Sequence, residues 1–226
     1  MKAMILAAGR GLRMAPLTDN LPKPLLAAGG KPLISWHLEK LAAANIIEIV
    51  VNVAHLGTMI EESLGNGSRF GVSIQYSRET EALETAGGIA WALSKLGDEP
   101  FLVINADVYS DLDYARLCRH DMASAVRAHL ILVPNPSHHP SGDFSLSNGF
   151  VTNGENERWT YSGLGVYRPE LFGTIVPGAK CPLAPLLRQA ADDGRVTGQL
   201  HSGFWMDVGN PLRLQELDRH IRQRAL

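Results

Sequence analysis

The chain has 226 residues, 45% of them hydrophobic, and a formal net charge of -2 at pH 7. This length and composition are sufficient for one sizeable hydrophobic core. A chain so close to neutrality has no broad positive field to attract nucleic acid or an anionic membrane, so any phosphate site must be local. We therefore expect small-molecule substrates, and neither nucleic acid nor a membrane, as partners; the composition leaves the oligomeric state open.

The two cysteines, Cys118 and Cys181, lie far apart in the sequence and have no neighbours at metal-ligand spacing. A disulfide framework is therefore not expected, and a reducing, cytoplasmic location is the simpler interpretation. The apolar run at residues 1–8 is followed by no cleavage-like region, which indicates a buried strand and not a signal peptide. No apolar stretch approaches the roughly 20 residues that a membrane-spanning helix needs.

Strand and helix patterns alternate along the first half of the chain. The predicted strands are residues 2–7, 46–53, 72–76 and 101–104, and the predicted helices are residues 32–44, 56–64 and 85–96. Such alternation is typical of an α/β fold, with a Rossmann-like, mostly parallel mixed sheet and helices on both faces.

The second half is less regular. We predict helices at residues 113–120, 183–192 and 211–222, and strands at 125–133, 159–167 and 196–201. Residues 134–154 are rich in Pro, Ser, Asn and Gly, which indicates loops and short strands inserted near residues 134–165. Asn210 is a plausible cap for the last helix. The paired histidines in this region and the arginines of the last helix are expected to face solvent: His138, His139, Arg213, Arg219, Arg222 and Arg224. We expect one domain, residues 1–226.

A glycine-rich segment, residues 6–13 (LAAGRGLR), follows the first predicted strand directly. In open α/β sheets, ligands bind beyond the carboxyl ends of the strands. Gly9 and Gly11 would let the backbone approach a ligand and direct N–H groups at phosphate oxygens, and the planar guanidinium of Arg13 suits a phosphate. The alternative is a tight turn with a surface arginine.

Lys23 lies between two prolines, Pro22 and Pro24, shortly after this segment. The prolines fix φ and stiffen the backbone, so the lysine loses less freedom when it meets a phosphate. The alternative is an exposed lysine in a proline turn. The pattern is neither a Walker-type P-loop nor a dinucleotide-binding fingerprint.

Two aspartates follow apolar residues at predicted strand ends. Asp107 comes after residues 101–104, and Asp207 after Trp205 and Met206. An unpaired buried carboxylate is costly, and two carboxylates at strand ends can converge on one Mg²⁺, which prefers oxygen ligands. The alternatives are a helix cap for Asp107 and a turn residue for Asp207.

Taken together, these segments resemble the sugar-phosphate nucleotidyltransferase family. The resemblance rests on residues 6–13, 22–25 (PKPL), 30–33 (GKPL), 85–88 (TAGG), 105–107 (Asn-Ala-Asp) and 205–209 (WMDVG), in order along nearly the whole chain. Residues 159–167 (WTYSGLGVY) and 203–205 (GFW) look most similar to the N-acetylmuramic acid 1-phosphate uridylyltransferase branch, which serves peptidoglycan (cell wall) recycling. Longer family members carry a left-handed β-helix, whose repeats this sequence lacks.

The resemblance implies a transfer in which the sugar phosphate attacks the α-phosphorus of UTP and pyrophosphate leaves. It implies a nucleotide-binding half, residues 1–110, and a sugar-binding half, residues 111–226. The catalytic residues would be Arg13 on the pyrophosphate portion, Lys23 on the α-phosphate, and Asp107 and Asp207 on a Mg²⁺ cofactor. The nucleotide site would comprise Leu6, Ala8, Gly9, Gly11, Leu12, Arg13, Lys23, Glu79, Thr80, Ala86, Gly87, Gly88 and Asn105. The sugar site would comprise Asn105, Gly142, Asp143, Glu155, Thr160, Gly163 and Trp205.

Some residues leave alternatives open. Glu84 stands where family members often have Gly, and Asn210 where they often have Thr. Small residues at 86–88 could serve helix packing in place of a base, and Trp205 could belong to the core. Another sugar 1-phosphate (such as glucose or mannose 1-phosphate), phosphocholine or another triphosphate is the nearest alternative substrate. A non-catalytic nucleotide-sugar sensor or a glycosyltransferase would be a different class of protein.

Overall fold

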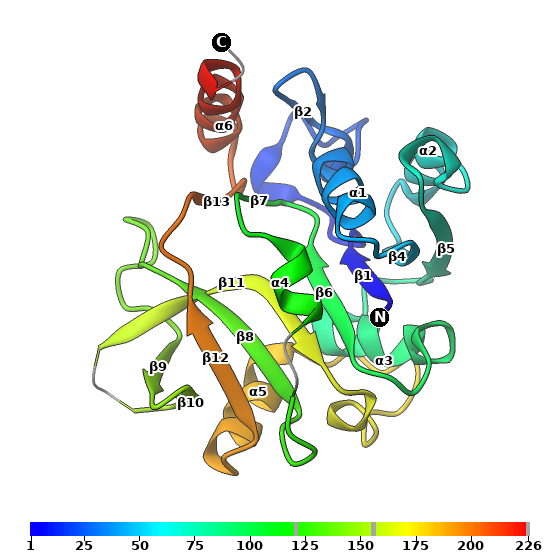
Figure 1. Ribbon diagram of the computed structural model, residues 1–226. Helices are drawn as coiled ribbons and strands as arrows, with labels where there is room; N and C mark the ends of the chain where they lie inside the picture. The colour runs from blue at the N-terminus through cyan, green and yellow to red at the C-terminus, as the bar shows by residue number, and fades with distance from the viewer. Residues whose placement is uncertain (120–121, 155–156, 225–226) are drawn as a thin grey trace.

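The computed structural model describes residues 1–119, 122–154 and 157–224. A nine-stranded mixed sheet in the order β5-β4-β1-β6-β11-β8-β12-β10-β9 forms its centre (Figure 1). The expected α/β fold is therefore confirmed. The strands of this sheet are β1 (Ala3–Leu6), β4 (Glu48–Val53), β5 (Ser73–Arg78), β6 (Phe101–Asn105), β8 (Ala128–Val133), β9 (Phe144–Ser147), β10 (Phe150–Thr152), β11 (Arg158–Tyr167) and β12 (Val196–Leu200).

The first four strands of the chain in this sheet, β1, β4, β5 and β6, are parallel. Most residues of β1, β4 and β6 are apolar and buried, as expected for parallel strands covered by helices, whereas the edge strand β5 mixes exposed polar residues with buried ones. The register pairs Leu6 with Asn52 on one side and with Asn105 on the other. The carboxyl ends of β1, β4 and β6 therefore lie side by side, and the segments that follow these strands all begin at the same edge of the sheet.

Helices cover both faces of this sheet. One hydrophobic cluster joins α1, α2 and α4 to the sheet, and a second joins α3 and α5 to the opposite face. The bounds are α1 (Leu33–Ala43), α2 (Gly57–Leu64), α3 (Glu84–Leu96), α4 (Tyr114–Cys118) and α5 (Leu183–Asp192). Among the described residues, none of the helices is long and apolar enough to pass through a bilayer.

The second half adds mainly antiparallel strands. β11 runs antiparallel to both β6 and β8, while β12 is parallel to β8. β9 pairs with β10 and also with the start of β11, so the pairings β11-β8-β12-β10-β9 close into a circuit. The segment that we expected to be irregular contributes β9, β10 and the first part of β11 to this circuit.

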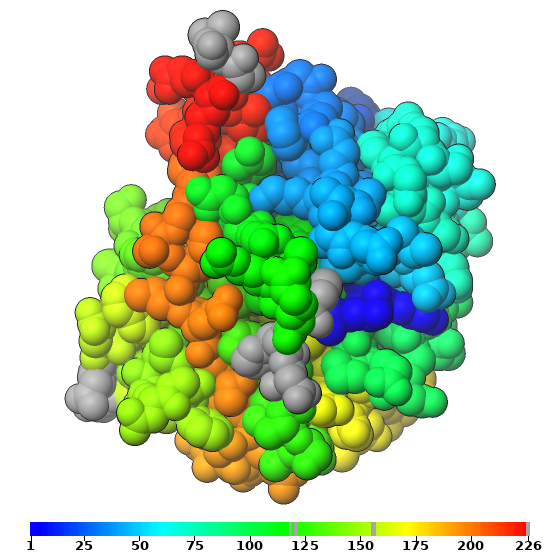
Figure 2. Space-filling model, viewed as in Figure 1, coloured from blue at the N-terminus to red at the C-terminus, as the bar shows by residue number. Residues whose placement is uncertain are grey.

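The chain ends with α6 (Pro211–Arg224), which lies beside the N-terminal hairpin of β2 (Ala27–Ala28) and β3 (Lys31–Pro32) (Figures 1 and 2). A third hydrophobic cluster, which includes Met14, Val208 and Leu217, joins α6 to the N-terminal loops. Just before α6, β13 (Trp205–Asp207) pairs antiparallel with β7 (Val108–Ser110). Neither short strand was among the predicted ranges, although Asp207 was expected at the end of a strand, where it lies.

Candidate active site

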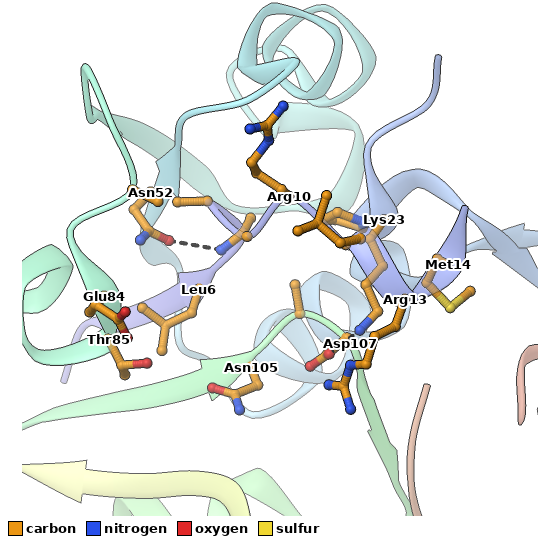
Figure 3. A pocket seen from close by; sticks show the side chains of 18 of the residues that line it. Leu6, Arg10, Arg13, Met14, Lys23, Asn52, Glu84, Thr85, Asn105 and Asp107 are labelled. Carbon is orange, nitrogen blue, oxygen red and sulfur yellow. Dashed lines mark hydrogen bonds and ion pairs between the residues drawn. The ribbon is translucent and has the colours of Figure 1, made fainter. Parts of the chain in front are cut away.

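A cavity of about 620 Å³ opens beyond the carboxyl ends of β1, β4 and β6 (Figure 3). Backbone and side chains from six separate segments form its wall. The lining residues are Leu6, Ala7, Ala8, Gly9, Arg10, Gly11, Leu12, Arg13, Met14, Lys23, Pro24, Asn52, Glu79, Ala82, Glu84, Thr85, Asn105, Ala106, Asp107 and Gly209. Its location agrees with the rule that open α/β sheets bind ligands beyond their carboxyl edge.

The glycine-rich loop bends sharply at Gly11, whose φ is 65°. A Cβ atom there would lie 3.1 Å from Thr18 Cγ2 and 3.3 Å from Lys23 Cβ, and the Thr18 hydroxyl donates a 2.9 Å hydrogen bond to the Gly11 carbonyl. Only glycine adopts this conformation without strain. The turn then continues to Met14, which is fully buried in the third cluster, and leaves Arg13 exposed at the cavity.

Lys23 and Asp107 form an ion pair at one end of the cavity. Lys23 lies in a short 3₁₀ turn (Lys23–Leu25), and its Nζ donates to Asp107 Oδ2. The side chains of Lys23 and Asp107 are 11% and 32% exposed, so the pair is shielded but reachable from the cavity. The Arg13 guanidinium lies at the same end (Figure 3). We call this part of the cavity, with Arg13, Lys23 and Asp107, the cationic end.

The pairing of β7 with β13 holds the backbone of the second aspartate, Asp207, next to that of Asp107, although Asp207 is not among the residues that line the cavity. Asp207 is opposite Val108 in the register, and the Val208 N–H donates a 2.8 Å hydrogen bond to the Asp107 carbonyl. Two carboxylates that are 100 positions apart in the sequence thus start from adjacent strands. Gly209, two residues beyond Asp207, lines the cavity itself.

Asp207 has two basic partners that we had expected to face solvent. Arg213 Nη1, on α6, donates to Asp207 Oδ1, and His138 Nε2 lies 3.0 Å from the same oxygen. The Arg213 side chain is only 12% exposed. The expectation of a solvated arginine was therefore wrong for Arg213, because α6 turns this face of its first turn toward β13. The His138 side chain is 40% exposed, as expected, although it contacts Asp207.

A lysine of α1 supports the backbone of β7 and of the residues after it. Lys40, on α1, donates from Nζ to the carbonyl of Ser110 and, at 3.3 Å, to that of Leu112. Burial lowers the pKa of Lys40, an effect that nearby Asp111 and Asp113 oppose. Lys40 therefore fixes the backbone on which Asp107 and the β7–β13 pairing depend.

The opposite end of the cavity, which we call the amide end, is formed by Leu6, Asn52, Glu84, Thr85 and Asn105 (Figure 3). Glu84 is exposed and has a φ of 63°, the left-handed region that β-carbon-bearing residues disfavour. No hydrogen bond or ion pair connects its side chain to another residue in the described part of the chain. The positive φ gives a physical reason for the glycine that the resemblance led us to expect at this position.

Most of the predicted nucleotide-site residues line the cavity. They are Leu6, Ala8, Gly9, Gly11, Leu12, Arg13, Lys23, Glu79 and Asn105. Thr80, Ala86, Gly87 and Gly88 do not. The Gly87 N–H bonds to the Cys181 carbonyl, and a Cβ atom at Gly87 would lie 2.4 Å from the carbonyl oxygen of Ala179. These packing contacts account for the small residues here, and a nucleotide role for these four residues stays a prediction.

The residues predicted for the sugar site lie outside the lining of this cavity, apart from Asn105. Asp143 accepts hydrogen bonds at 2.8 Å from the Tyr161 N–H and contacts His139 at 3.0 Å. Thr160 is buried and donates to Asn135 Oδ1. Gly142, Gly163 and Trp205 also have structural contacts. A Cβ at Gly142 would meet Asn135 and Arg158, one at Gly163 would meet Asn105, and Trp205 Nε1 donates to the Ser162 carbonyl. Glu155 lies outside the described residues.

Gly163 has a particular effect on the cavity. Its φ is 79°, and a Cβ atom there would lie 2.6 Å from Asn105 Nδ2. β11, which carries Gly163, is next to β6 in the sheet. A glycine here therefore leaves room for the Asn105 side chain at the end of β6, which connects the predicted sugar-side residue to the cavity indirectly.

The cavity residue Asn52 escaped the sequence analysis, as did the contacts of His138 and Arg213 with Asp207. Asn52 had a visible signal, because it is the one amide within a β-branched run, residues 46–53. A polar side chain in a buried strand is retained only when it is hydrogen-bonded. His138 and Arg213 had no such signal, since their contact with Asp207 depends on how α6 and the β8–β9 loop pack.

Comparisons with known proteins agree on one family. The family described as "Nucleotidyl transferase" matches residues 2–158, more than half of the chain. An N-acetylmuramate alpha-1-phosphate uridylyltransferase from Neisseria meningitidis serogroup B is 53% identical, with 96% of each chain covered. A protein of the same name from Caulobacter vibrioides is 35% identical, with 92% of each chain covered.

A solved structure agrees with the fold. A Bacillus anthracis protein assigned as a glucose-1-phosphate thymidylyltransferase, in complex with a sucrose, superposes with a TM-score of 0.88 at 23% identity, covering 98% of this chain and 95% of the other. At that identity the likeness concerns the fold alone. The family match and the two relatives show that the chain belongs to the nucleotidyl transferase family. It resembles the N-acetylmuramate alpha-1-phosphate uridylyltransferases over nearly its whole length.

Glu84 offers a test of backbone strain at the amide end. A left-handed conformation costs a residue with a Cβ roughly 1–2 kcal/mol but costs glycine little. We expect Glu84→Gly to have a free energy of unfolding about 1 kcal/mol higher than Glu84→Ala, measured by urea denaturation. Both variants lose the carboxylate, so their difference reports the backbone. Equal stabilities, or a more stable alanine variant, would contradict the strained conformation.

Proposed function

We propose that this chain is a uridylyltransferase that converts UTP and N-acetylmuramic acid alpha-1-phosphate into UDP-N-acetylmuramic acid and pyrophosphate, in the cytoplasm and as a step of peptidoglycan recycling. The names and coverage of the two curated relatives support this substrate pair. The observation that carries the proposal is the cationic end, where Arg13, Lys23 and Asp107 meet at the mouth of a glycine-rich loop.

The reaction needs little covalent chemistry from the protein. An oxygen of the sugar phosphate attacks the α-phosphorus of UTP, a new P–O bond forms, and the bond to the pyrophosphate leaving group breaks. The attacking oxygen is already anionic near neutral pH, so no general base is required. The obstacles are repulsion between two anions and charge that builds up on the leaving group, and catalysis is accordingly positioning plus electrostatic stabilisation.

Each cationic residue has a role in this scheme. Lys23, stiffened by Pro22 and Pro24 and only 11% exposed, provides a fixed positive charge at the α-phosphate. Arg13 is exposed beside it and is free to hold the pyrophosphate portion. The glycine-rich loop provides backbone N–H groups for the remaining phosphate oxygens. Asn105 and the amide end accommodate the nucleoside and the start of the sugar.

Mg²⁺ is the cofactor that we propose for this site. Asp107 and Asp207 supply the hard oxygen ligands that this ion prefers, start from adjacent strands, and are 32% and 25% exposed at the side chain. The donor set therefore fits a cation that keeps several waters and shares its other positions with phosphate oxygens. When bound, the ion would neutralise charge on the phosphates.

A different sugar 1-phosphate remains the second candidate. A mannose-1-phosphate guanyltransferase from Schizosaccharomyces pombe is 33% identical over 93% of this chain, but this chain spans only 61% of that protein. The residues of the cationic end would serve any such pair of substrates equally well. A non-catalytic sensor is less well supported, because Lys23, Asp107 and Asp207 are all retained.

A pyrophosphate-release assay tests the proposal directly. The purified chain is supplied with Mg²⁺ and each combination of UTP, dTTP, GTP and CTP with N-acetylmuramic acid, N-acetylglucosamine, glucose or mannose 1-phosphate. We expect the highest kcat/KM for UTP with N-acetylmuramic acid alpha-1-phosphate. A clear preference for another pair would reassign the substrate, and no pyrophosphate from any pair would overturn the reaction class.

Lys23→Ala tests the cationic end. We expect kcat to fall by about 100-fold or more, because a fixed donor to the reacting phosphate is lost. Lys180→Ala is the matched control: Lys180 forms an exposed ion pair with Glu81, and such pairs contribute little. Steady-state pyrophosphate release measures both. A Lys23 variant with turnover like that of the Lys180 control would refute the assigned role.

Asp207→Asn tests the metal assignment. The amide keeps the shape but weakens a metal ligand, so the Mg²⁺ concentration for half-maximal activity should rise by roughly tenfold or more. The far-UV circular dichroism spectrum should be unchanged. Asp193→Asn, an exposed aspartate after α5, is the control. If the Mg²⁺ titration of the Asp207 variant overlays that of wild type, this residue does not hold the ion.

A further inference from the structure

Three hydrogen bonds in series join two walls of the cavity at the amide end. The Ala7 N–H donates to Asn52 Oδ1 at 2.8 Å, a bond drawn in Figure 3. Asn52 Nδ2 donates to Glu79 Oε1 at 2.7 Å, and the Leu83 N–H donates to Glu79 Oε2 at 2.9 Å. We call this series, from Ala7 through Asn52 and Glu79 to Leu83, the amide relay.

The amide relay is buried and closely packed. Asn52 is 4% exposed and Glu79 is 7% exposed. A Cβ atom at Gly88 would lie 2.6 Å from Glu79 Oε1 and 3.0 Å from Asn52 Nδ2, so the glycine at this position of α3 makes room for the relay. Packing at this density leaves the two side chains little freedom to adopt another arrangement.

The two ends of the relay belong to the two segments that enclose the nucleoside. Ala7 begins the glycine-rich loop, which continues through Ala8 and Gly9, whereas Leu83 directly precedes Glu84 and Thr85 on the opposite wall. We propose that Asn52 and Glu79 are positioning residues that set the separation of these two walls, and with it the slot for the uracil of UTP. This inference rests on the proposed function. It assigns Glu79 a role behind the slot in place of direct recognition of the base.

The polarity of the relay has one consistent arrangement. N–H donors stand at both ends, Glu79 contributes two acceptors, and Asn52 contributes one acceptor and one donor. If Glu79→Gln replaces the carboxylate by an amide, one N–H must face another N–H somewhere in the series, whichever way either amide is turned. If Asn52→Asp replaces the amide, two carboxylates face each other.

The double variant Asn52→Asp/Glu79→Gln restores every bond. The new carboxylate at position 52 accepts from the Ala7 N–H and from the new amide at position 79. That amide's oxygen then accepts from the Leu83 N–H. The net charge of the pair is unchanged, but the carboxylate has moved from one residue to the other. A positioning role therefore predicts recovery in the double variant, whereas direct recognition of the base by the Glu79 carboxylate predicts none.

The experiment compares wild type, both single variants and the double variant. Isothermal titration calorimetry gives the Kd for UTP, and pyrophosphate release gives KM for each substrate, well below the unfolding temperature of every variant. We expect each single variant to raise the Kd and KM for UTP by about tenfold, because a buried donor without an acceptor, or two facing carboxylates, is costly. The KM for the sugar phosphate should stay the same, and the double variant should recover most of the UTP affinity.

Ser77→Ala is the matched control. Ser77 is paired with Asn52 in the β4–β5 register and is 1% exposed, and its hydroxyl has no hydrogen-bond partner within the described residues. Its removal changes a buried polar group beside the relay without touching a relay bond, so UTP affinity should be unchanged.

Two outcomes overturn the inference. Wild-type UTP affinity in both single variants would show that the relay does not shape the slot. A double variant as weak as Glu79→Gln would show that the carboxylate must be at position 79, and thus that it contacts the nucleotide. If wild type binds UTP but releases no pyrophosphate with any sugar phosphate, the proposed function fails, and the relay is still judged by the four Kd values.

Discussion

The pairing of β7 with β13 is the contact on which the acidic part of the site depends. Each strand has three residues, too few to be stable as an isolated ribbon. Surrounding contacts hold it in place: Trp205 Nε1 donates to the Ser162 carbonyl at 2.9 Å, Tyr109 meets Phe204 edge-on, and Lys40 ties the carbonyl end of β7 to α1. The pairing then brings the backbones of Asp107 and Asp207 together, although one strand comes from the middle of the chain and the other from near its end.

Each of the two carboxylates has a basic partner within the chain. Asp107 is paired with Lys23, and Asp207 with Arg213 and His138. Lys23 binds Oδ2 of its partner, whereas Arg213 and His138 share Oδ1 of theirs. A divalent ion at this position would compete with these cations for the same two carboxylates. In the proposed reaction, metal and phosphate binding would then be linked, since Lys23, which would lose its contact with Asp107, lines the same cavity.

The sequence predicted the regular elements well and their contacts less well. α3 was expected at residues 85–96 and spans Glu84–Leu96, and α5 has the predicted bounds, because long runs with clear periodicity define their own limits. β7, β13, β9 and β10 are too short to show a period. The level carboxyl ends of β1, β4 and β6, and the contact of Arg213 with Asp207, depend on register and packing, which local patterns do not encode.

The site residues likewise divide into those that a local sequence signal predicted and those whose role depends on packing in the fold. Arg13, Lys23 and Asp107 are adjacent to sequence signals such as glycines, prolines and a strand end, and they do meet in one cavity. Gly87 shows the opposite case: the sequence identified an unusual small residue, but its reason is a carbonyl oxygen packed against α3. A small residue in the sequence indicates that another atom lies close to its backbone, but not whether that atom belongs to a ligand or to the protein. Only the folded structure distinguishes the two.

The closing helix joins these parts. Asn210 caps α6 by accepting a 2.9 Å hydrogen bond from the Arg213 N–H, as the sequence predicted. The cap sets the first turn of the helix, and that turn directs Arg213 toward Asp207. Farther along, Leu217 packs in the cluster that also buries Met14, the residue that follows Arg13 in the glycine-rich loop. One helix therefore supports both the acidic strand pair and the glycine-rich loop that lines the cavity, and a shift of α6 would alter the two together.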